Sequence, residues 1–251
     1  MAGGPPAGGP PAGAPPAGPP PARAQPDGAP APPATRTLAE LRALPAEQAL
    51  SAGGGQPIID GYVIPEDLSI TFANGRQNPV DVIVGFNKDE HTAFGGATNT
   101  NTAQRDGMAW HMRLFAERQT KIGRKAFFYI FTHEPPYDEG TPNLRATHAS
   151  EIVYAFNNLD KLRSFPDSSS LKLAVASEKS RQMADQMSSY WTNFAKTGDP
   201  NGRGLPQWPV FKDRNAPPFA LGEIKEWPSA ETLNAFDERY AKIMAQLMPG
   251  K

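Results

Sequence analysis

A single carboxylate follows the point where an apolar run of the sequence ends and a polar turn begins. The β-branched run 80–84, between Pro79 and Gly85, is typical of a short strand that is buried on both faces, as in parallel sheets. The polar turn 87–90 then ends in Glu90. In open α/β sheets, functional sites form at the carboxyl ends of the strands. Glu90 is therefore a candidate for chemistry, although a lone carboxylate in a polar turn is most often a solvated charge.

Two segments, FNKDEH at 86–91 and ATHASEIVYAF at 146–156, resemble motifs of one known family, the type B carboxylesterases, which include the cholinesterases. The segment FNKDEH at 86–91 resembles the family's N-x-D-E-G turn, whose Glu orients the catalytic histidine. The segment ATHASEIVYAF at 146–156 resembles the family's H-G-x-E-I-x-x-x-F, whose histidine is the catalytic base and here is His148. YWTNFAKTGDPN at 190–201 matches the family's late helix and turn nearly letter for letter. The resemblance runs from Thr37 to Leu247 and also includes PIIDGYVIP at 57–65 and LPQWPVF at 205–211.

Two residues depart from the family pattern. His91 stands where the family usually has a glycine, which would permit positive φ and close approach, so this departure bears on the local backbone geometry. Ala149 also stands at a usual glycine position, a small change.

The resemblance implies acyl-transfer chemistry. Such a triad needs a nucleophile, a base that takes its proton, and an acid that fixes the tautomer of the base. The order in α/β-hydrolases is serine, acid, histidine, and Glu90 followed by His148 preserves the last two. No G-x-S-x-G pentapeptide occurs in the sequence, and neither does an HGGG-type oxyanion loop. This chain alone is therefore expected to be inactive as an ester hydrolase.

The remaining candidates have simpler interpretations. Glu151 is interpreted as a structural carboxylate at the start of a helix near the site. His91, His111 and His133 belong to no partner motif and are expected to be surface or helix residues. The sequence has no metal-ligand cluster, phosphate loop or dinucleotide fingerprint, so no cofactor and no metal are expected.

Composition narrows the possible partners. The net charge is −1 and there is no cysteine, so neither nucleic-acid binding nor a disulfide framework is indicated. No run approaches the roughly 18 apolar residues of a membrane span, and no signal peptide is recognisable. Localisation is left undetermined by these features. The implied partner is a small-molecule ester in the complete family enzyme.

The chain is predicted to have two parts. Residues 1–36 are rich in Pro, Gly and Ala and contain almost no large apolar side chain, so we expect a disordered, low-complexity tail. Residues 37–251 are expected to form the carboxyl-terminal part of a type B carboxylesterase domain.

The predicted elements alternate between helices and strands, which indicates an α/β class. The resemblance implies an incomplete, mostly parallel sheet with flanking helices, part of an α/β-hydrolase fold. Strands are predicted at 80–84, 126–131 and 219–221. Helices are predicted at 38–50 as a pair broken by Pro45, and at 69–75, 103–121, 150–157, 171–197 and 229–248.

Two functions from different classes remain open. In the first, the chain supplies the acid and the histidine of a serine carboxylesterase, and a separate amino-terminal half that contains the nucleophile is a candidate partner. In the second, it is a non-catalytic binding or assembly module derived from a hydrolase, with the proline-rich tail as a tether or a ligand for aromatic grooves.

Overall fold

The computed structural model of the chain describes residues 37–51, 57–99, 101–136, 140, 142–159, 177–224 and 226–249. The chain forms two compact units, Met1–Gln56 and Pro57–Lys251. The tail predicted at 1–36, and the first turns of the helix predicted at 171–197, lie outside the described residues.

The described part of the first unit is a pair of short helices. Helix α1 covers Leu38–Arg42, and α2 covers Ala46–Ser51, so Pro45 separates them as the sequence predicted. Thr37 and Glu40 form a capping box at the start of α1, because each side chain accepts from the other residue's backbone N–H.

The second unit is built on a parallel sheet of three strands in the order β1-β2-β3. Strand β1 covers Val82–Asn87, β2 covers Ala126–Phe131 and β3 covers Phe219–Leu221. Val82 pairs with Ala126 and Asn87 with Phe131, whereas β3 pairs with the second half of β2.

The sequence placed both ends of β1 too early, since the strand begins at Val82 and not at Val80. The strand passes through Gly85 and ends at Asn87. Gly85 lies directly opposite Tyr129, and a Cβ at Gly85 would come within 2.3 Å of the Tyr129 ring. This glycine therefore permits a close approach inside the strand and does not form a turn. Burial on both faces was also predicted for β1 and is found for β2 instead, because β1 lies at an edge of the sheet.

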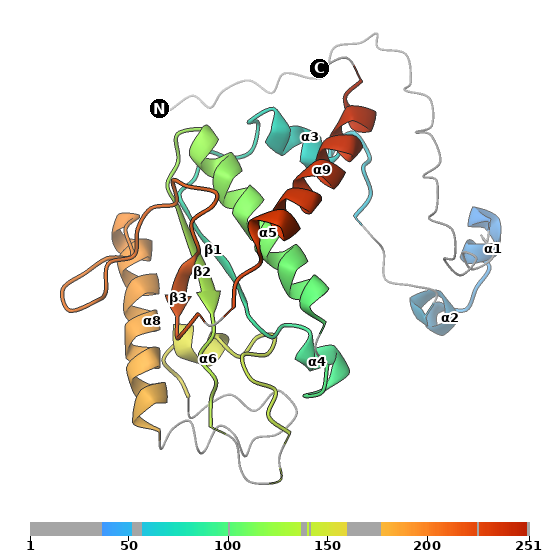
Figure 1. Cartoon of the computed structure of the whole chain (residues 1–251). Coiled ribbons are helices and arrows are strands. Elements are labelled where there is room, and N and C mark those ends of the chain that lie inside the picture. Colours follow the sequence, from blue (N-terminus) through green and yellow to red (C-terminus); the bar gives the residue numbers. More distant parts are fainter. Residues whose placement is uncertain are drawn as a thin grey trace, which may run out of the picture. The chain divides into compact units, whose positions relative to one another are not determined.

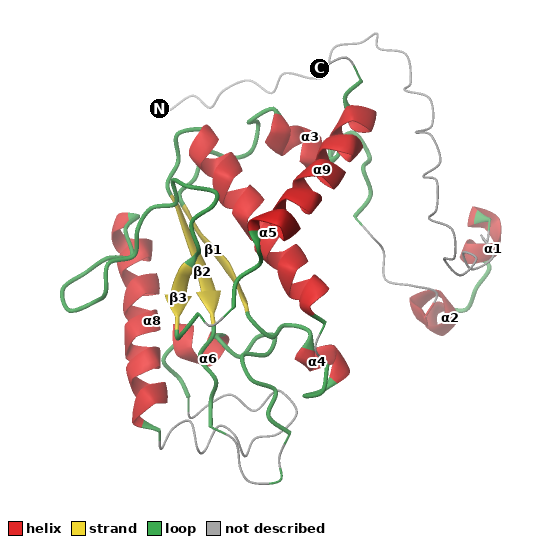
Figure 2. Ribbon diagram, viewed as in Figure 1, coloured by secondary structure: helices red, strands yellow, loops and turns green. Residues whose placement is uncertain are grey.

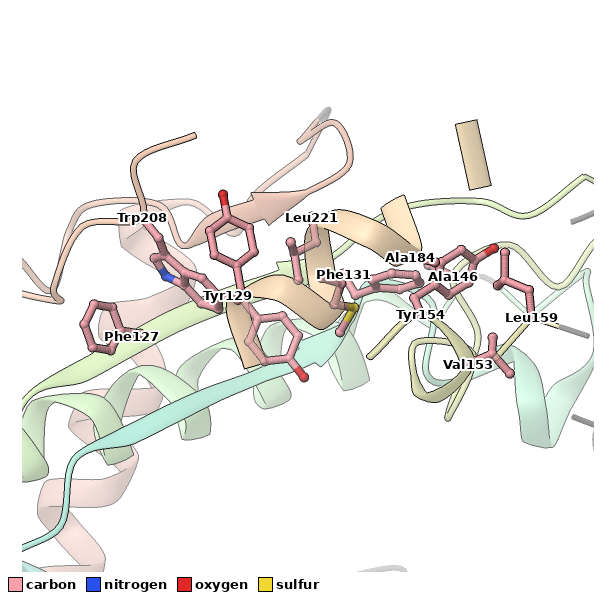
Figure 3. Packing of buried hydrophobic residues seen from close by; sticks show 12 residues of the cluster. Phe127, Tyr129, Phe131, Ala146, Val153, Tyr154, Leu159, Ala184, Trp208 and Leu221 are labelled. Atoms are coloured by element: carbon pink, nitrogen blue, oxygen red, sulfur yellow. The ribbon is translucent and has the colours of Figure 1, made fainter. Parts of the chain in front are cut away.

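Helices cover both faces of the sheet, as Figures 1 and 2 show. Alternate side chains of β2 point to opposite faces, and all six are buried. Phe127, Tyr129 and Phe131 pack with Trp208 and residues of α6 and α8, and Figure 3 shows this cluster. Ala126, Phe128 and Ile130 pack instead with residues of β1 and α5.

The helices follow the predicted pattern closely. α5 covers Thr102–Lys121, α8 covers Glu178–Thr197 and ends at Gly198 in the left-handed conformation, and α9 covers Ala230–Leu247. α9 lies against α5, where the buried Arg113 forms an ion pair with Asp237. The shorter helices are α3 at Leu68–Ala73, α4 at Thr92–Gly95 and α6 at Ile152–Ala155. Among the described residues, no helix combines the length and the apolar character that crossing a membrane requires.

Candidate active site

The structure brings Glu90 and His148 into contact. Glu90 Oε2 lies 2.5 Å from His148 Nδ1, although the two residues are 58 positions apart. Because a carboxylate oxygen accepts, Nδ1 carries the proton, and the lone pair of a neutral imidazole is then on Nε2. The Glu90 side chain is 14% exposed and that of His148 is 50% exposed. The acid is thus enclosed by the protein, while the imidazole reaches the surface.

The register of the backbone explains how the two side chains meet. Beyond β1, Lys88 N still donates to Phe131 O of β2, at 2.9 Å. Asp89 then pairs in parallel with Thr147, and Asp89 N donates to Ala146 O at 2.9 Å. Since the pairing is parallel, the next residue of each segment lies beside the next of the other, and these residues are Glu90 and His148.

The carboxylate of Asp89 holds the same two segments together. Asp89 is 6% exposed. Its oxygens accept from Arg145 Nε at 2.9 Å and from Ala146 N at 3.3 Å. Arg145 also donates to Ala97 O at 3.0 Å, so it connects the acid turn, the histidine segment and the loop after α4. Asp89 lies in the turn that resembles the family motif, but the sequence analysis assigned a role only to Glu90 of that turn.

Asn87 and Glu151 lie directly beside the Glu90–His148 pair. Asn87 N donates to Glu90 Oε1 at 3.0 Å, so both oxygens of Glu90 are engaged. The Asn87 carboxamide donates to Thr147 O at 2.7 Å and to Glu151 Oε2. Burial raises the pKa of the Glu151 carboxyl, and the hydrogen bond from Asn87 acts against this rise. Glu151 thus lies at the start of α6 and near the site, as the sequence predicted.

Burial also affects the phenol of Tyr129, which is 8% exposed on β2. The low-polarity surroundings raise its pKa, and the negative charges of Glu151 and Glu90 add to the rise. Tyr129 is therefore a neutral phenol at any physiological pH.

The two departures from the family's glycines have the opposite consequences from those expected. Ala149 has φ of 64°, in the left-handed region that favours glycine, so this change strains the backbone and is not small. His91 has φ of −67°, which any residue adopts, so the turn after Glu90 makes no demand for glycine.

Of the three remaining histidines, His91 is buried against expectation and His133 is partly buried. His111 is exposed on α5, as expected. His91, however, is 5% exposed because the turn folds it inward. His133 packs against the rings of Phe131 and Tyr154, and its Nε2 lies 3.1 Å from Ser180 Oγ. Burial, with the positive charge of Lys179, lowers the pKa of His133 to about 4.

The described residues contain no group of three histidine, aspartate or glutamate side chains that could hold a metal ion. At this edge of the sheet, Asn87 N donates to Glu90 and Glu90 contacts the imidazole of His148.

The fold and this carboxylate–histidine pair define the carboxyl-terminal part of an α/β-hydrolase. Residues 106–236 match the model of the Carboxylesterase family, and the chain belongs to that family. The matched range includes His148 and begins after Glu90. The family match therefore does not include Glu90, whose candidate role depends on its turn motif and on the contact with His148.

Known proteins match this chain over a part of their own length. Carboxylesterase 3 from Pongo abelii is 38% identical over 131 residues, which are 51% of this chain and 21% of that protein. Cocaine esterase from Homo sapiens is 37% identical over 87 residues, 34% of this chain and 14% of that protein. The chain thus spans about a fifth, or less, of the length of these relatives.

Two solved structures have the same fold. Carboxylesterase EST55 from Geobacillus stearothermophilus superposes with a TM-score of 0.54 and 23% identity, over 78% of this chain and 48% of that one. A PNB esterase superposes with a TM-score of 0.56 and 20% identity, over 84% of this chain and 50% of that one. The described sheet and helices thus correspond to about half of an α/β-hydrolase.

Proposed function

We propose that this chain supplies the acid and the base of a Ser-Glu-His triad to a serine hydrolase of carboxylic esters. The observation that supports this most directly is the 2.5 Å contact between Glu90 Oε2 and His148 Nδ1. In that arrangement Glu90 fixes the tautomer and stabilises the imidazolium, and His148 Nε2 takes the proton of the nucleophile. The acid role belongs to Glu90 and the base role to His148.

The nucleophile comes from outside these 251 residues, since they contain no G-x-S-x-G elbow. The amino-terminal half of a family carboxylesterase, as a preceding stretch of the same polypeptide or as a separate chain, would supply the serine and the oxyanion donors. The edge of β1 is where that half would continue the sheet.

Complementation tests the proposal. The chain alone should hydrolyse a small activated ester negligibly, because removing a triad serine costs on the order of 10⁶ in kcat. Mixing or co-expression with an amino-terminal half that contains the serine should restore turnover. Glu90→Gln and His148→Ala should each abolish the restored activity, and Glu134→Gln, an exposed carboxylate, should leave it unchanged. Restored activity that survives His148→Ala would refute the proposal, as would turnover by the chain alone that His148→Ala abolishes.

A further inference from the structure

Asn87 contacts Glu90 and the residue that precedes His148, and it does so through two different parts of itself. Its main-chain N–H donates to Glu90 Oε1 at 3.0 Å. Its carboxamide nitrogen donates to Thr147 O at 2.7 Å, and Thr147 directly precedes His148. The side chain is 1% exposed, so water does not compete for these bonds.

The orientation of the carboxamide is fixed by its partners. A carbonyl oxygen accepts and cannot donate, so the amide nitrogen has to face Thr147 O. The second hydrogen of the same nitrogen reaches Glu151 Oε2. The amide oxygen has no hydrogen-bond partner among the described protein groups. The nitrogen is thus the part of this side chain that makes contacts.

Thr147 is also the first residue of the turn that contains His148. Ser150 N donates to Thr147 O at 3.1 Å, which closes a turn over residues 147–150. His148 occupies the second position of this turn, and Ala149, with φ of 64°, occupies the third. Because Ala149 is strained there, the turn needs a further contact to hold its shape, and the Asn87 amide supplies one.

We propose that Asn87 is a positioning residue that sets the orientation of His148 relative to Glu90. Its main chain holds the carboxylate, and its side chain holds the turn on which the imidazole is mounted. The positions of Glu90 and of the turn that contains His148 are therefore both fixed by hydrogen bonds to Asn87, the last residue of β1. This inference rests on the proposed function, since an acid–base pair that does no chemistry needs no such alignment.

The tautomer of His148 is a readout that a purely structural role would not change. The ¹⁵N chemical shifts of the ring nitrogens report the fraction of imidazole with its proton on Nδ1, and they can be measured on the full chain without any activity. His148→Gln assigns the signals. Glu90→Ala should lower the Nδ1–H fraction, because the acceptor of that proton is removed.

Asn87→Leu keeps the approximate volume of the side chain and removes its donors. We expect a loss of the Nδ1–H fraction similar to that in Glu90→Ala. Asn87→Ser, which is too short to reach Thr147 O, should give the same loss and serves if the leucine variant does not fold.

Thr92→Val is the matched control. Thr92 is 1% exposed, and its hydroxyl connects the same two segments by donating to Leu144 O and contacting Thr147 Oγ1. The hydrogen bonds of this hydroxyl go to other atoms than Thr147 O and the Glu90 carboxylate. The valine variant should lose stability and keep the wild-type tautomer.

The outcomes separate this inference from the proposed function. If Glu90→Ala leaves the Nδ1–H fraction unchanged, the acid–base pair itself is refuted, and the role of Asn87 with it. If Glu90→Ala lowers the fraction, but Asn87→Leu and Asn87→Ser resemble Thr92→Val, Asn87 is a structural residue and the inference alone is overturned.

Discussion

At the scale of single residues, the strain at Ala149 makes a direct prediction about stability. Replacing Ala149 with glycine removes the clash that positive φ imposes on a Cβ and should stabilise the fold by about 0.5–1 kcal/mol. Chemical denaturation measures this. The control is Ala241→Gly at an exposed position of α9, which should lose a similar amount. An Ala149→Gly variant less stable than the wild type would contradict the assigned backbone conformation.

His133 should make stability depend on pH. Its pKa is about 4 in the folded chain, against an ordinary value of 6.5. The neutral form is favoured by folding, so the stabilisation is fully present above pH 6.5 and is lost as the pH falls towards 4. The loss should be on the order of 2 kcal/mol once solvent screening is allowed for. Denaturation at both ends of this range should show a smaller fall in His133→Gln and an unchanged fall in His111→Gln, the exposed histidine.

These residues also show where sequence reasoning succeeds and fails. The contact between Glu90 and His148 could be predicted because each residue lies in a short segment that resembles a family motif. The burial of His91 and the partial burial of His133 could not be predicted, because they depend on which loops fold over these residues. The strain at Ala149 follows from a turn that is closed by a hydrogen bond from Ser150. The family's usual glycine at this position was a signal for it, but the change to alanine was interpreted as small.

At the scale of elements, Gly85 decides whether β1 can pair with β2. A Cβ at Gly85 would lie 2.3 Å from the ring of Tyr129 and 2.4 Å from its carbonyl oxygen. Gly85→Ala should therefore destabilise the sheet by about 1–3 kcal/mol or more, and truncating Tyr129 should not rescue it, because the backbone oxygen remains. Gly107→Ala in α5 is the control, since its Cβ would make an ordinary 3.8 Å contact with Phe236. A tolerated Gly85→Ala would argue against this strand register.

The sequence predicted β2, β3, α5 and α9 almost to the residue. β2 is apolar at every position, and Ser229 caps the start of α9. The end of β1 could not be predicted in the same way. A glycine after a β-branched run suggests a turn, and the reason that it continues the strand lies in Tyr129, on another strand.

At the scale of the whole molecule, the outer edge of β1 governs how the chain associates. Val82 N and Lys88 N donate towards β2, at Lys125 O and Phe131 O. The backbone groups of the alternate residues Ile83 and Gly85 therefore point away from β2, at an edge where the sheet of the described residues ends. The last outward-pointing N–H of β1, that of Asn87, already donates to Glu90. The outward-pointing groups of the first part of the strand are left as a template for pairing with another chain.

We therefore expect the full chain, expressed alone, to self-associate, and to be rescued by co-expression with an amino-terminal half that continues the sheet. Val80 lies just before β1 and is 53% exposed. Val80→Lys places a charge beside the edge and should reduce association in size-exclusion chromatography. Ile243→Lys on α9 adds the same charge at a 41% exposed position away from the edge and should not. If the unmodified chain is a monomer that melts cooperatively, its edge is already protected, and the non-catalytic module becomes the better account of this protein.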